Sequence, residues 1–425
     1  MASIRTLMQI AVQHDLTVHQ MDVNTAFLNA PIDCELYVEQ PEGYEIKSKN
    51  DEKLVLRLKK SLYGLKQSGR NWNHTLHTYL IEQGYSQSRT DSCVYKKHSE
   101  GQPDDYAIVV IWVDDLLLAT KHESTMTNEK DKLKQKFRMK DLGKIGWFLG
   151  IEFAHEHEKI TMCQSRYIER LLNRFGMQDC KPKYTPCDMN TNKLSNLDGE
   201  EIDAKLYREI VGALIYVMTS TRPDLCYIVT KLSQHMARPN SNHIILAKHV
   251  LRYLKGTNNQ RLIFRKSLEP MNLNGFCDAD WANSADRRSI TGYGFELLRE
   301  GPLISWKAKK QPTIALSTCE AEYMSMAAAT QEGKFLLALI NDMTVGIPLN
   351  QFSLHCDNQG AIALANNPVQ HQRSKHIDIR YHFVRDEIQN GSLPLFYILS
   401  EDNMADVFTK PVVRSKIEKF RSLLI

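Results

Sequence analysis

The chain has 425 residues and a formal net charge of +4, from 54 basic and 50 acidic side chains. This length exceeds one compact core, so two or three domains are expected, and so small a charge does not by itself indicate a nucleic-acid partner. Nine cysteines without a Cys-x-x-Cys pair argue against a zinc knuckle or a disulfide scaffold, and no apolar run reaches the length of a membrane span.

The first part of the chain mixes predicted helices and strands. Met1–Asp15 has helix-like apolar spacing, and Val18–Asn29 is an apolar, strand-like run that carries Asp22. The spacing of apolar side chains predicts an amphipathic helix over Ser68–Tyr85. A second, lysine-rich helix is predicted over Glu129–Met139. Together these segments indicate a domain that contains both helices and strands.

The most informative segment is Ile108–Thr120, where Asp114 and Asp115 stand between two apolar runs. Runs rich in Val, Ile and Leu predict a strand, a tight turn and a second strand. Two carboxylates at the tip of a mostly buried hairpin are costly unless a cation neutralises them, and a divalent metal is the usual answer. Aspartate is also common in turns because it bonds its own backbone, so a purely structural role is the alternative. A third acid, Asp22, on another predicted strand favours the metal.

The middle of the chain is predicted to be helical. A short helix is expected over Tyr167–Phe175, and Lys181–Asp203, with two prolines and few apolar residues, resembles an exposed linker. Three longer helices follow, separated by breaks before proline. They are expected over Tyr207–Ser220, Leu225–Met236 and His243–Leu254.

From about Leu273 the apolar period returns to that of strands. An antiparallel meander is expected first, then a long helix, then alternating strands and helices. The predicted strands are Leu273–Ala279, Thr291–Leu298, Leu303–Trp306, a further strand ending at Ala315, Phe352–Cys356 and Leu395–Leu399. The predicted helices run from Ser317 to about Asp342, from Asn358, over Ile377–Gln389 and from about Met404.

Four acids in this last third could converge on one site. Asp278 and Asp357 lie toward the ends of predicted strands, and Glu320 lies in the first turn of a helix. Several carboxylates around two cations are what two-metal hydrolysis requires. Two of the four have a structural alternative: Ser317-x-x-Glu320 is also a capping box, and Asp406 is also an acid that is favourable in the first turn of a helix.

Three cysteines directly precede three of these acids, at Cys277, Cys319 and Cys356. Neighbouring residues on a strand face opposite sides, so Cys277 and Cys356 can be buried while Asp278 and Asp357 face the site. Because unpaired cysteine is among the most buried residue types, we interpret these thiols as packing groups rather than ligands.

Taken together, these motifs resemble the reverse transcriptase and ribonuclease H portion of a copia-type LTR retrotransposon polyprotein. The match covers nearly the whole chain and follows the order of the family. The segments that resemble polymerase motifs are Met21–Ala30, Leu58–Trp72, Trp112–Leu117 and Phe148–Phe153. Those that resemble the connecting region are Thr221–Leu225 and Leu251–Thr257. Those that resemble the ribonuclease H end are Asp278–Ala282, Ser317–Tyr323, Asp357–Ile362, Lys375–Asp386 and Asn403–Pro411.

The resemblance implies an α+β fold, in which a polymerase palm with a helical thumb and connection is followed by an α/β ribonuclease H-like domain with a mixed sheet. It divides the chain into a fingers remnant and palm at 1–180, a linker with the thumb and connection at 181–270, and the ribonuclease H-like domain at 271–425.

The resemblance also implies roles for individual residues. The catalytic and metal-binding acids would be Asp22, Asp114 and Asp115 in the polymerase, and Asp278, Glu320, Asp357 and Asp406 in the ribonuclease H. The residues that contact nucleotide and template would be Lys66, Gln67, Ser68, Gly69 and Arg70. The primer grip would be Phe148, Leu149 and Gly150.

The implied activity is RNA-directed DNA polymerisation with ribonuclease H cleavage, by two-metal phosphoryl transfer with two Mg²⁺ per site, or Mn²⁺ in their place. The implied partners are an RNA template, a DNA primer, dNTPs and an RNA–DNA hybrid, in cytoplasmic retrotransposon particles. Asp22 lies only 21 residues after Met1, so the resemblance predicts a chain truncated at its N-terminus. The alternative is a polymerase-inactive remnant that only binds nucleic acid or keeps only ribonuclease H activity.

Overall fold

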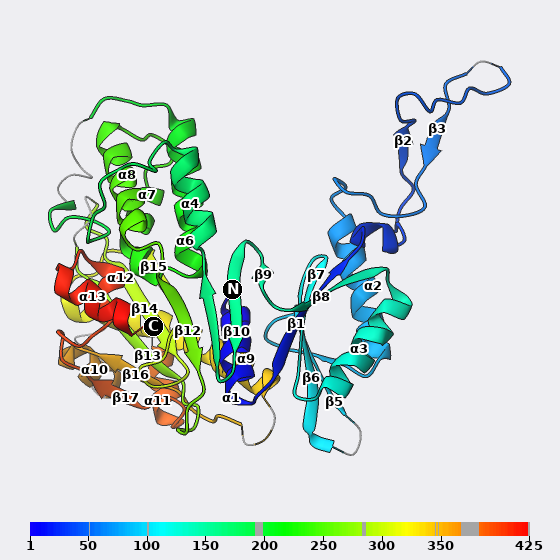
Figure 1. The fold of residues 1–425 in the computed structure, drawn as a ribbon. Coiled ribbons are helices and arrows are strands. Elements are labelled where there is room, and N and C mark those ends of the chain that lie inside the picture. Colours follow the sequence, from blue (N-terminus) through cyan, green and yellow to red (C-terminus); the bar gives the residue numbers. More distant parts are fainter. Residues whose placement is uncertain are drawn as a thin grey trace. The chain divides into compact units, whose positions relative to one another are not determined.

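The computed structural model describes residues 1–50, 52–99, 102–191, 199–282, 286–344, 346, 348–366 and 382–423. The chain has a mixed α+β structure and forms two compact units (Figure 1). The smaller unit is formed by residues 14–145, and the larger unit combines residues 1–13 with 146–425. The smaller unit is therefore an insertion in the sequence of the larger one.

The smaller unit is built on a six-stranded antiparallel sheet in the order β4-β5-β6-β7-β1-β8. Its strands are β1 (Thr17–Val23), β4 (Ser86–Gln87), β5 (Val94–Ser99), β6 (Gln102–Trp112), β7 (Asp115–Thr120) and β8 (Met139–Lys144). Its helices are η1 (Ala26–Asn29), α2 (Ser68–Glu82) and α3 (Glu123–Lys136). The predicted hairpin around Asp114 and the predicted amphipathic helix are confirmed, and α3 begins six residues earlier than expected. The core joins Trp72 and Leu76 of α2 to Val109 and Leu116 of the hairpin.

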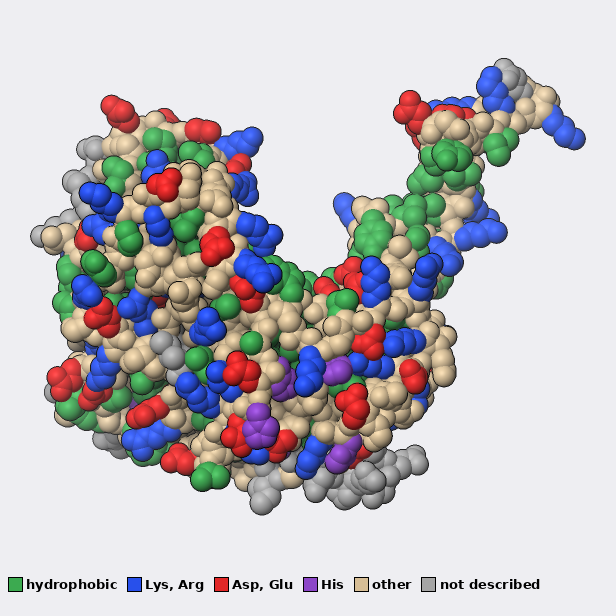
Figure 2. Space-filling view, viewed as in Figure 1, with side chains coloured by type: hydrophobic (Ala, Val, Ile, Leu, Met, Phe, Trp, Pro, Cys, Tyr) green, Lys and Arg blue, Asp and Glu red, His purple; other side chains and the backbone are tan. Residues whose placement is uncertain are grey.

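A separate two-stranded sheet, β2 (Tyr37–Glu39) and β3 (Val55–Arg57), belongs to the same unit. Large apolar side chains here are exposed, including Tyr44 at 79 % and Ile46 at 69 %. Figure 2 shows hydrophobic side chains gathered along this hairpin. The sequence pattern predicts no helix or strand in this region, because its apolar side chains do not pack against a core.

The first part of the larger unit is a four-stranded antiparallel sheet beside a group of helices. The strands, in the order β12-β11-β10-β9, are β9 (Trp147–Phe148), β10 (Ile151–Glu156), β11 (Lys159–Cys163) and β12 (Arg261–Arg265). The helices are α4 (Ser165–Arg174), α6 (Ala204–Ser220), η2 (Pro223–Leu225), α7 (Cys226–Ser233) and α8 (Ser241–Gly256). The helices α6, α7 and α8 lie side by side and share one apolar core, so the three predicted helices are confirmed (Figure 1).

The segment predicted to be an exposed linker is partly packed. Cys187 and Thr191 are buried, and the amide of Lys183 donates a hydrogen bond to the carbonyl oxygen of Arg252 on α8 (3.2 Å). This part of the prediction is wrong because Cys187 and the partly buried Ile202 pack in the helical core, whereas Tyr184 and Met189 are exposed. Residues 192–198 lie outside the described residues.

The second part of the larger unit is a mixed five-stranded sheet in the order β15-β14-β13-β16-β17. The first three strands are antiparallel, whereas β16 is parallel to β13 and β17 is parallel to β16. The strands are β13 (Asn274–Asp280), β14 (Ile290–Glu296), β15 (Leu303–Lys310), β16 (Ser353–Cys356) and β17 (Leu395–Tyr397). The helices are α9 (Thr318–Met343), α10 (Gln359–Asn366), α11 (Phe383–Gln389), α12 (Asp406–Thr409) and α13 (Arg414–Ser422).

Helices cover both faces of this sheet. On β14, the Tyr293 hydroxyl donates a hydrogen bond to Glu332 of α9 (3.2 Å), whereas Gly292 and Gly294 lie against Phe408 of α12. Successive residues of a strand face opposite sides, so α9 and α12 lie on opposite faces. The expected strand ending at Ala315 is absent from this described region, because β15 itself extends to Lys310 and irregular chain leads from there to α9. The predicted start of the α11 helix, at residues 377–381, lies outside the described residues.

The first helix, α1 (Ala2–Gln13), packs within the larger unit. The Arg5 guanidinium donates to the carbonyl oxygens of Ile304 (2.7 Å) and Ser220 (2.9 Å). One and two turns further on, Gln9 and Gln13 donate to the carbonyls of residues 265 and 267 at 3.0 and 2.8 Å.

The predicted boundaries at 180/181 and 270/271 both fall within the larger unit, so the three-domain division stays a prediction. Of the helices described, none is both long and apolar enough to cross a membrane.

Candidate functional site

Three acids meet at one end of the sheet in the smaller unit. The β6–β7 hairpin turns at Val113 and Asp114, and Asp115 is the first residue of β7. Asp22 on β1 is the register partner of Asp115, and the amide of Val23 donates to the carbonyl oxygen of Asp114 (2.8 Å). Two antiparallel strand pairings therefore bring the predicted polymerase acids together.

The electrostatics of this cluster fit a cation. Burial raises the pKa of Asp115, and the nearby carboxylates of Asp114 and Asp22 raise it further. The side-chain amide of Gln20 donates to Asp115 Oδ1 (3.2 Å) and opposes the shift. Carboxylate oxygens are the ligands that Mg²⁺ prefers. A divalent ion would relieve the mutual repulsion of these acids, so the donor set suits the expected metal.

The five residues predicted to contact nucleotide and template lie at the start of α2. Ser68 is fully buried, and its hydroxyl donates to a carbonyl oxygen of the preceding loop at 2.5 Å. Gln67 contacts the thiol of Cys34, and Arg70 forms an ion pair with Asp33. The exposed members of the segment are Lys66, Gly69 and Arg70. Ser68 thus fixes the start of the helix, while its neighbours Lys66, Gly69 and Arg70 are accessible at the surface.

The predicted primer grip is a tight turn between β9 and β10. Phe148 is buried and pairs with Ile151, while Leu149 and Gly150 have φ values of 51° and 74°. Two successive residues with positive φ are typical of a two-residue hairpin turn. A Cβ atom on Gly150 would lie 2.9 Å from the hydroxyl oxygen of Tyr216, which itself donates to the carbonyl oxygen of Leu149. Only glycine therefore fits this position without displacing Tyr216.

A second group of acids lies at the mixed sheet of the larger unit. Asp278 on β13, Asp357 directly after β16 and Asp406 on α12 offer carboxylate oxygens that lie within 4.8 Å of one another. Asp278 and Asp406 are almost fully buried. Three of the four acids predicted to converge are brought together, because parallel β13 and β16 end side by side.

The fourth predicted acid, Glu320, lies elsewhere. Its amide donates to the hydroxyl oxygen of Ser317 (3.1 Å), and its carboxylate accepts a hydrogen bond from the amide of Leu316 (2.7 Å). The first bond caps the start of α9, and the second ties the Glu320 carboxylate to the residue before the N-cap Ser317, so the pair is a variant of the expected capping box. The expectation that Glu320 joins the cluster is corrected: the carboxylate is held at the helix start.

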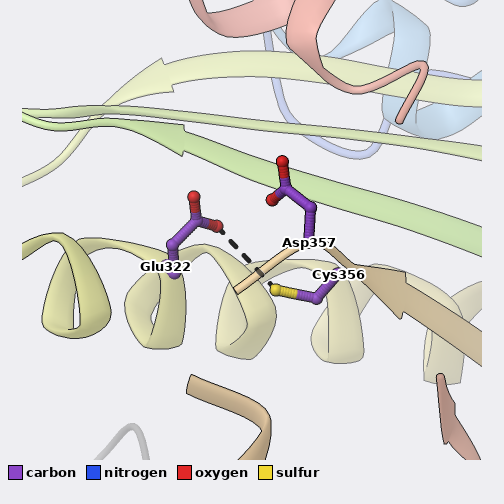
Figure 3. A group of neighbouring side chains, drawn as sticks. All are labelled: Glu322, Cys356 and Asp357. Atoms are coloured by element: carbon purple, nitrogen blue, oxygen red, sulfur yellow. Dashed lines mark hydrogen bonds between the residues drawn. The ribbon is translucent and has the colours of Figure 1, made fainter. Parts of the chain in front are cut away.

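Glu322, which the sequence analysis did not single out, takes the expected place (Figure 3). Its carboxylate oxygen, the thiol of Cys356 and the carboxylate of Asp357 lie within 4.8 Å of one another. Figure 3 shows Glu322 reaching from α9 toward the end of β16. Two helix residues that are two apart point about 200° away from each other, so Glu320 and Glu322 cannot both face one site. The capping box was the available signal, because it assigns Glu320 to the helix start.

The neighbouring thiols are buried. Cys277 and Cys356 are fully buried register partners on β13 and β16, in keeping with a packing role. The thiol of Cys356 also approaches Glu322 Oε2 at 4.0 Å.

Burial and mutual repulsion dominate the electrostatics of the second cluster. Burial raises the pKa of Asp278 to about 7, against the lowering effect of the Lys410 ammonium. Burial, with the charge of Asp278 as the next cause, raises the pKa of Glu322 to about 11. Buried carboxylates in such proximity disfavour their charged forms unless cations are present. The oxygen donors of this cluster therefore also suit a divalent metal.

Two lysines that the sequence analysis overlooked face this cluster. Lys410 Nζ lies 2.6 Å from one carboxylate oxygen of Asp406, and Lys416 Nζ lies 2.5 Å from the other. Lys410 lies four residues after Asp406 and directly follows the end of α12, in extended backbone. This short separation in sequence was the available signal for the first of these contacts.

The amino-acid sequence matches known proteins along its whole length. Residues 1–189 match the family model described as reverse transcriptase (RNA-dependent DNA polymerase). The whole chain is 38 % identical, over 435 residues, to a retrovirus-related Pol polyprotein from transposon TNT 1-94 of Nicotiana tabacum, and covers 32 % of it. It is 31 % identical to a putative transposon Ty5-1 protein of Saccharomyces cerevisiae, covering all of that protein with 73 % of this chain.

Thus the chain spans about a third of the length of the tobacco relative. Among solved structures, the N-terminal ribonuclease H domain of a Mycobacterium tuberculosis protein, fused to maltose binding protein, aligns with 35 % of this chain and 96 % of that chain. The sequence identity is 8 % and the TM-score is 0.25.

Proposed function

The chain belongs to the retrovirus-related Pol polyproteins of copia-type retrotransposons, and from this premise we propose that it is an RNA-directed DNA polymerase with ribonuclease H activity. Its substrates would be a DNA primer on an RNA template, dNTPs, and the RNA strand of an RNA–DNA hybrid. Both sites would use Mg²⁺, with Mn²⁺ as a substitute. The proposed setting is the cytoplasmic particle of the element.

The observation that carries the polymerase proposal is the register pairing of Asp22 with Asp115 beside Asp114, in the part of the chain that matches the reverse transcriptase model. Asp22 and Asp114 would hold the metal ions, while Asp115, bonded to Gln20, would hold the hairpin in place. Bound divalent cations would supply the charge that activates the attacking oxygen and stabilises the leaving oxygen. The exposed side chain of Lys66 would meet nucleotide or template phosphates.

The ribonuclease H proposal is supported by the second cluster. Asp278, Glu322, Asp357 and Asp406 would bind the cations and orient the scissile phosphate, so Glu322 replaces Glu320 in the proposed set. The backbone of β13 and β16 holds two of these acids at fixed spacing, and α9 and α12 bring one each. Carboxylates fixed by secondary structure lose little freedom when substrate binds, which favours catalysis.

The polymerase site is tested by primer extension with Mg²⁺, comparing the unmodified chain with Asp114→Asn. Asp131→Asn is the matched control, because Asp131 is an exposed acid on α3. Extension by the unmodified chain and by the control, with loss of at least a hundredfold in Asp114→Asn, is expected. Equal extension by Asp114→Asn would reject the assignment.

The second site is tested with an end-labelled RNA–DNA hybrid. Glu322→Gln removes a charge from the cluster, whereas Glu320→Gln makes the same chemical change two residues earlier, at the helix cap. Cleavage is expected to disappear in Glu322→Gln and to persist in Glu320→Gln. The opposite result would restore Glu320 as the catalytic acid and contradict the assignment made from the geometry.

A further inference from the structure

Lys410 lies within the second carboxylate cluster rather than beside it. Its Nζ is 2.6 Å from Asp406 Oδ1 and 3.9 Å from Asp278 Oδ1. The two acids come from different elements, α12 and β13, and their side chains are only 7 % and 3 % exposed. Lys416 Nζ contacts the other oxygen of Asp406 at 2.5 Å. Both oxygens of Asp406 therefore face an ammonium group.

This arrangement leaves little room for a metal ion between Asp406 and Asp278. A magnesium ion that bridged the two carboxylates would lie about 2.0–2.1 Å from an oxygen of each. The ammonium of Lys410 is in contact with the same Asp406 oxygen and faces the same Asp278 carboxylate. A cation placed there would also be repelled strongly, because charges at such short distances interact by several kcal/mol even at an effective dielectric of about 20.

The other side of the cluster is different. Ligand atoms of Asp357, Glu322 and Cys356 lie within 4.8 Å of one another, and no lysine ion pair with either acid is found among the described residues. The Lys410 charge also acts on Asp357, but less than on Asp278 and Asp406. Asp357 accepts a hydrogen bond from the hydroxyl of Ser400, which is neutral. A divalent ion can therefore be held on this side by Asp357 and Glu322 without displacing an ion-paired lysine, whereas the second oxygen of Asp278 accepts a hydrogen bond from the Thr409 hydroxyl.

We propose that the Lys410 ammonium takes the place of one divalent cation at this cluster, so that the site binds a single metal ion on the side of Asp357 and Glu322. The proposal rests on the proposed ribonuclease H function for its meaning in catalysis. It replaces the expectation of two metal ions at this site by one metal ion and one lysine. Lys410 supplies a positive charge that is covalently fixed and cannot dissociate, and Lys416 holds Asp406 toward it.

The test counts bound Mn²⁺ in the full chain by electron paramagnetic resonance, with isothermal titration calorimetry as a second measurement. The parent protein carries Asp22→Asn and Asp114→Asn, which removes metal binding at the polymerase acids. Lys410→Met is then compared with this parent. Two controls are added: Lys410→Arg keeps the charge, and Lys419→Met removes a charge that pairs with exposed Asp402 (2.7 Å) outside the cluster.

We expect one Mn²⁺ in the parent and in both controls, and one additional Mn²⁺ in Lys410→Met. An equal count in the parent and in Lys410→Met would overturn the proposal. If Lys410→Met does not fold, as judged by circular dichroism, the parent count decides: two ions, both lost in Asp357→Asn, would also overturn it. Hybrid cleavage by the unmodified chain is measured separately. Absence of cleavage with the expected difference in Mn²⁺ count would reject the proposed function and leave the role of Lys410 intact.

Discussion

The indole Nε1–H of Trp72 donates a hydrogen bond to the carbonyl oxygen of Val113, 2.6 Å away. Val113 has a φ of 58°, in the left-handed region that a β-branched residue rarely adopts and that costs about 1–3 kcal/mol. Trp72 is 1 % exposed, and its ring meets Phe137 edge-on at 5.2 Å. A side chain locked in the core thus holds the strained turn that carries Asp114.

Replacing Trp72 by Phe keeps an aromatic ring and removes the donor. We expect a loss of about 1 kcal/mol in the free energy of unfolding, from the lost hydrogen bond. We also expect about a tenfold fall in kcat for primer extension, because Asp114 is no longer held in one position. Urea denaturation and steady-state extension measure the two effects.

Trp281→Phe is the matched control for that variant. The indole of Trp281 also donates to a carbonyl oxygen, that of Ala315 at 3.0 Å, but in the larger unit. Because Trp281 is 45 % exposed, whereas Trp72 is buried, Trp281→Phe should cost less stability, and it should leave extension unchanged. Equal kcat values for Trp72→Phe and the unmodified chain would show that the turn does not depend on this hydrogen bond.

Glu296 gives the larger unit a pH-dependent stability. Its side chain on β14 is 3 % exposed, and burial raises its pKa from 4.5 to about 8. The folded state therefore binds more protons than the unfolded state between these values, so this contribution is complete below pH 4.5 and is lost as pH rises through 8. In Glu296→Gln, the fall in stability between pH 5 and pH 9 should shrink by about 4 kcal/mol. Urea denaturation at the two pH values measures it, and the exposed Glu269→Gln should not alter the slope.

Arg222 and Asp224 form a fully buried ion pair with two hydrogen bonds, of 2.9 and 2.7 Å. The Tyr253 hydroxyl also donates to Asp224 (2.7 Å). Asp224→Asn leaves the guanidinium without its counter-charge, and we expect a loss of about 3–5 kcal/mol in the free energy of unfolding. Asp402→Asn breaks an exposed pair and should cost less than about 1 kcal/mol. Similar losses in the two variants, measured by chemical denaturation, would argue that water reaches the buried pair.

Gly333, in the middle of α9, is expected to reject alanine. Alanine usually stabilises a helix by about 1 kcal/mol relative to glycine. Here a Cβ atom would lie 2.3 Å from the ring of Phe352, so we expect a loss of about 1–3 kcal/mol instead. Gly212→Ala on α6 is the control, since nothing lies within 4 Å of its Cβ position and the usual gain should appear. Melting temperatures that rise in both variants would contradict the close packing of α9 on the sheet.

Elements that have one clear apolar period were predictable from the sequence. The hairpin around Asp114, the helix that buries Trp72 and the three helices after residue 203 are where the spacing indicated them. In each case the side chains on one face meet a single core, so local spacing carries enough information. The expected strand ending at Ala315 failed because its apolar residues sit in irregular chain that leads into α9.

Features that depend on distant contacts were not predictable in this way. Glu320 and Glu322 differ only in which side of α9 they face, and that is decided by the packing of the helix on the sheet. Lys410 and Asp278 are 132 residues apart, and only the return of α12 to β13 brings them together. Similarly, helix-like spacing in the first residues did not reveal which unit α1 belongs to.

The hydrogen bond from Arg5 to Ile304 spans 299 residues, which sets an order for events during synthesis of the chain. At about 5–20 residues per second, α1 leaves the ribosome roughly 15–60 s before its partner strand exists. Residues 14–145 meet no such delay, because their sheet is complete within the segment. The smaller unit can therefore fold before the last strands of the larger unit have been synthesised. In that interval the apolar side of α1 has no partner strand to pack on, which makes it a natural target for a chaperone.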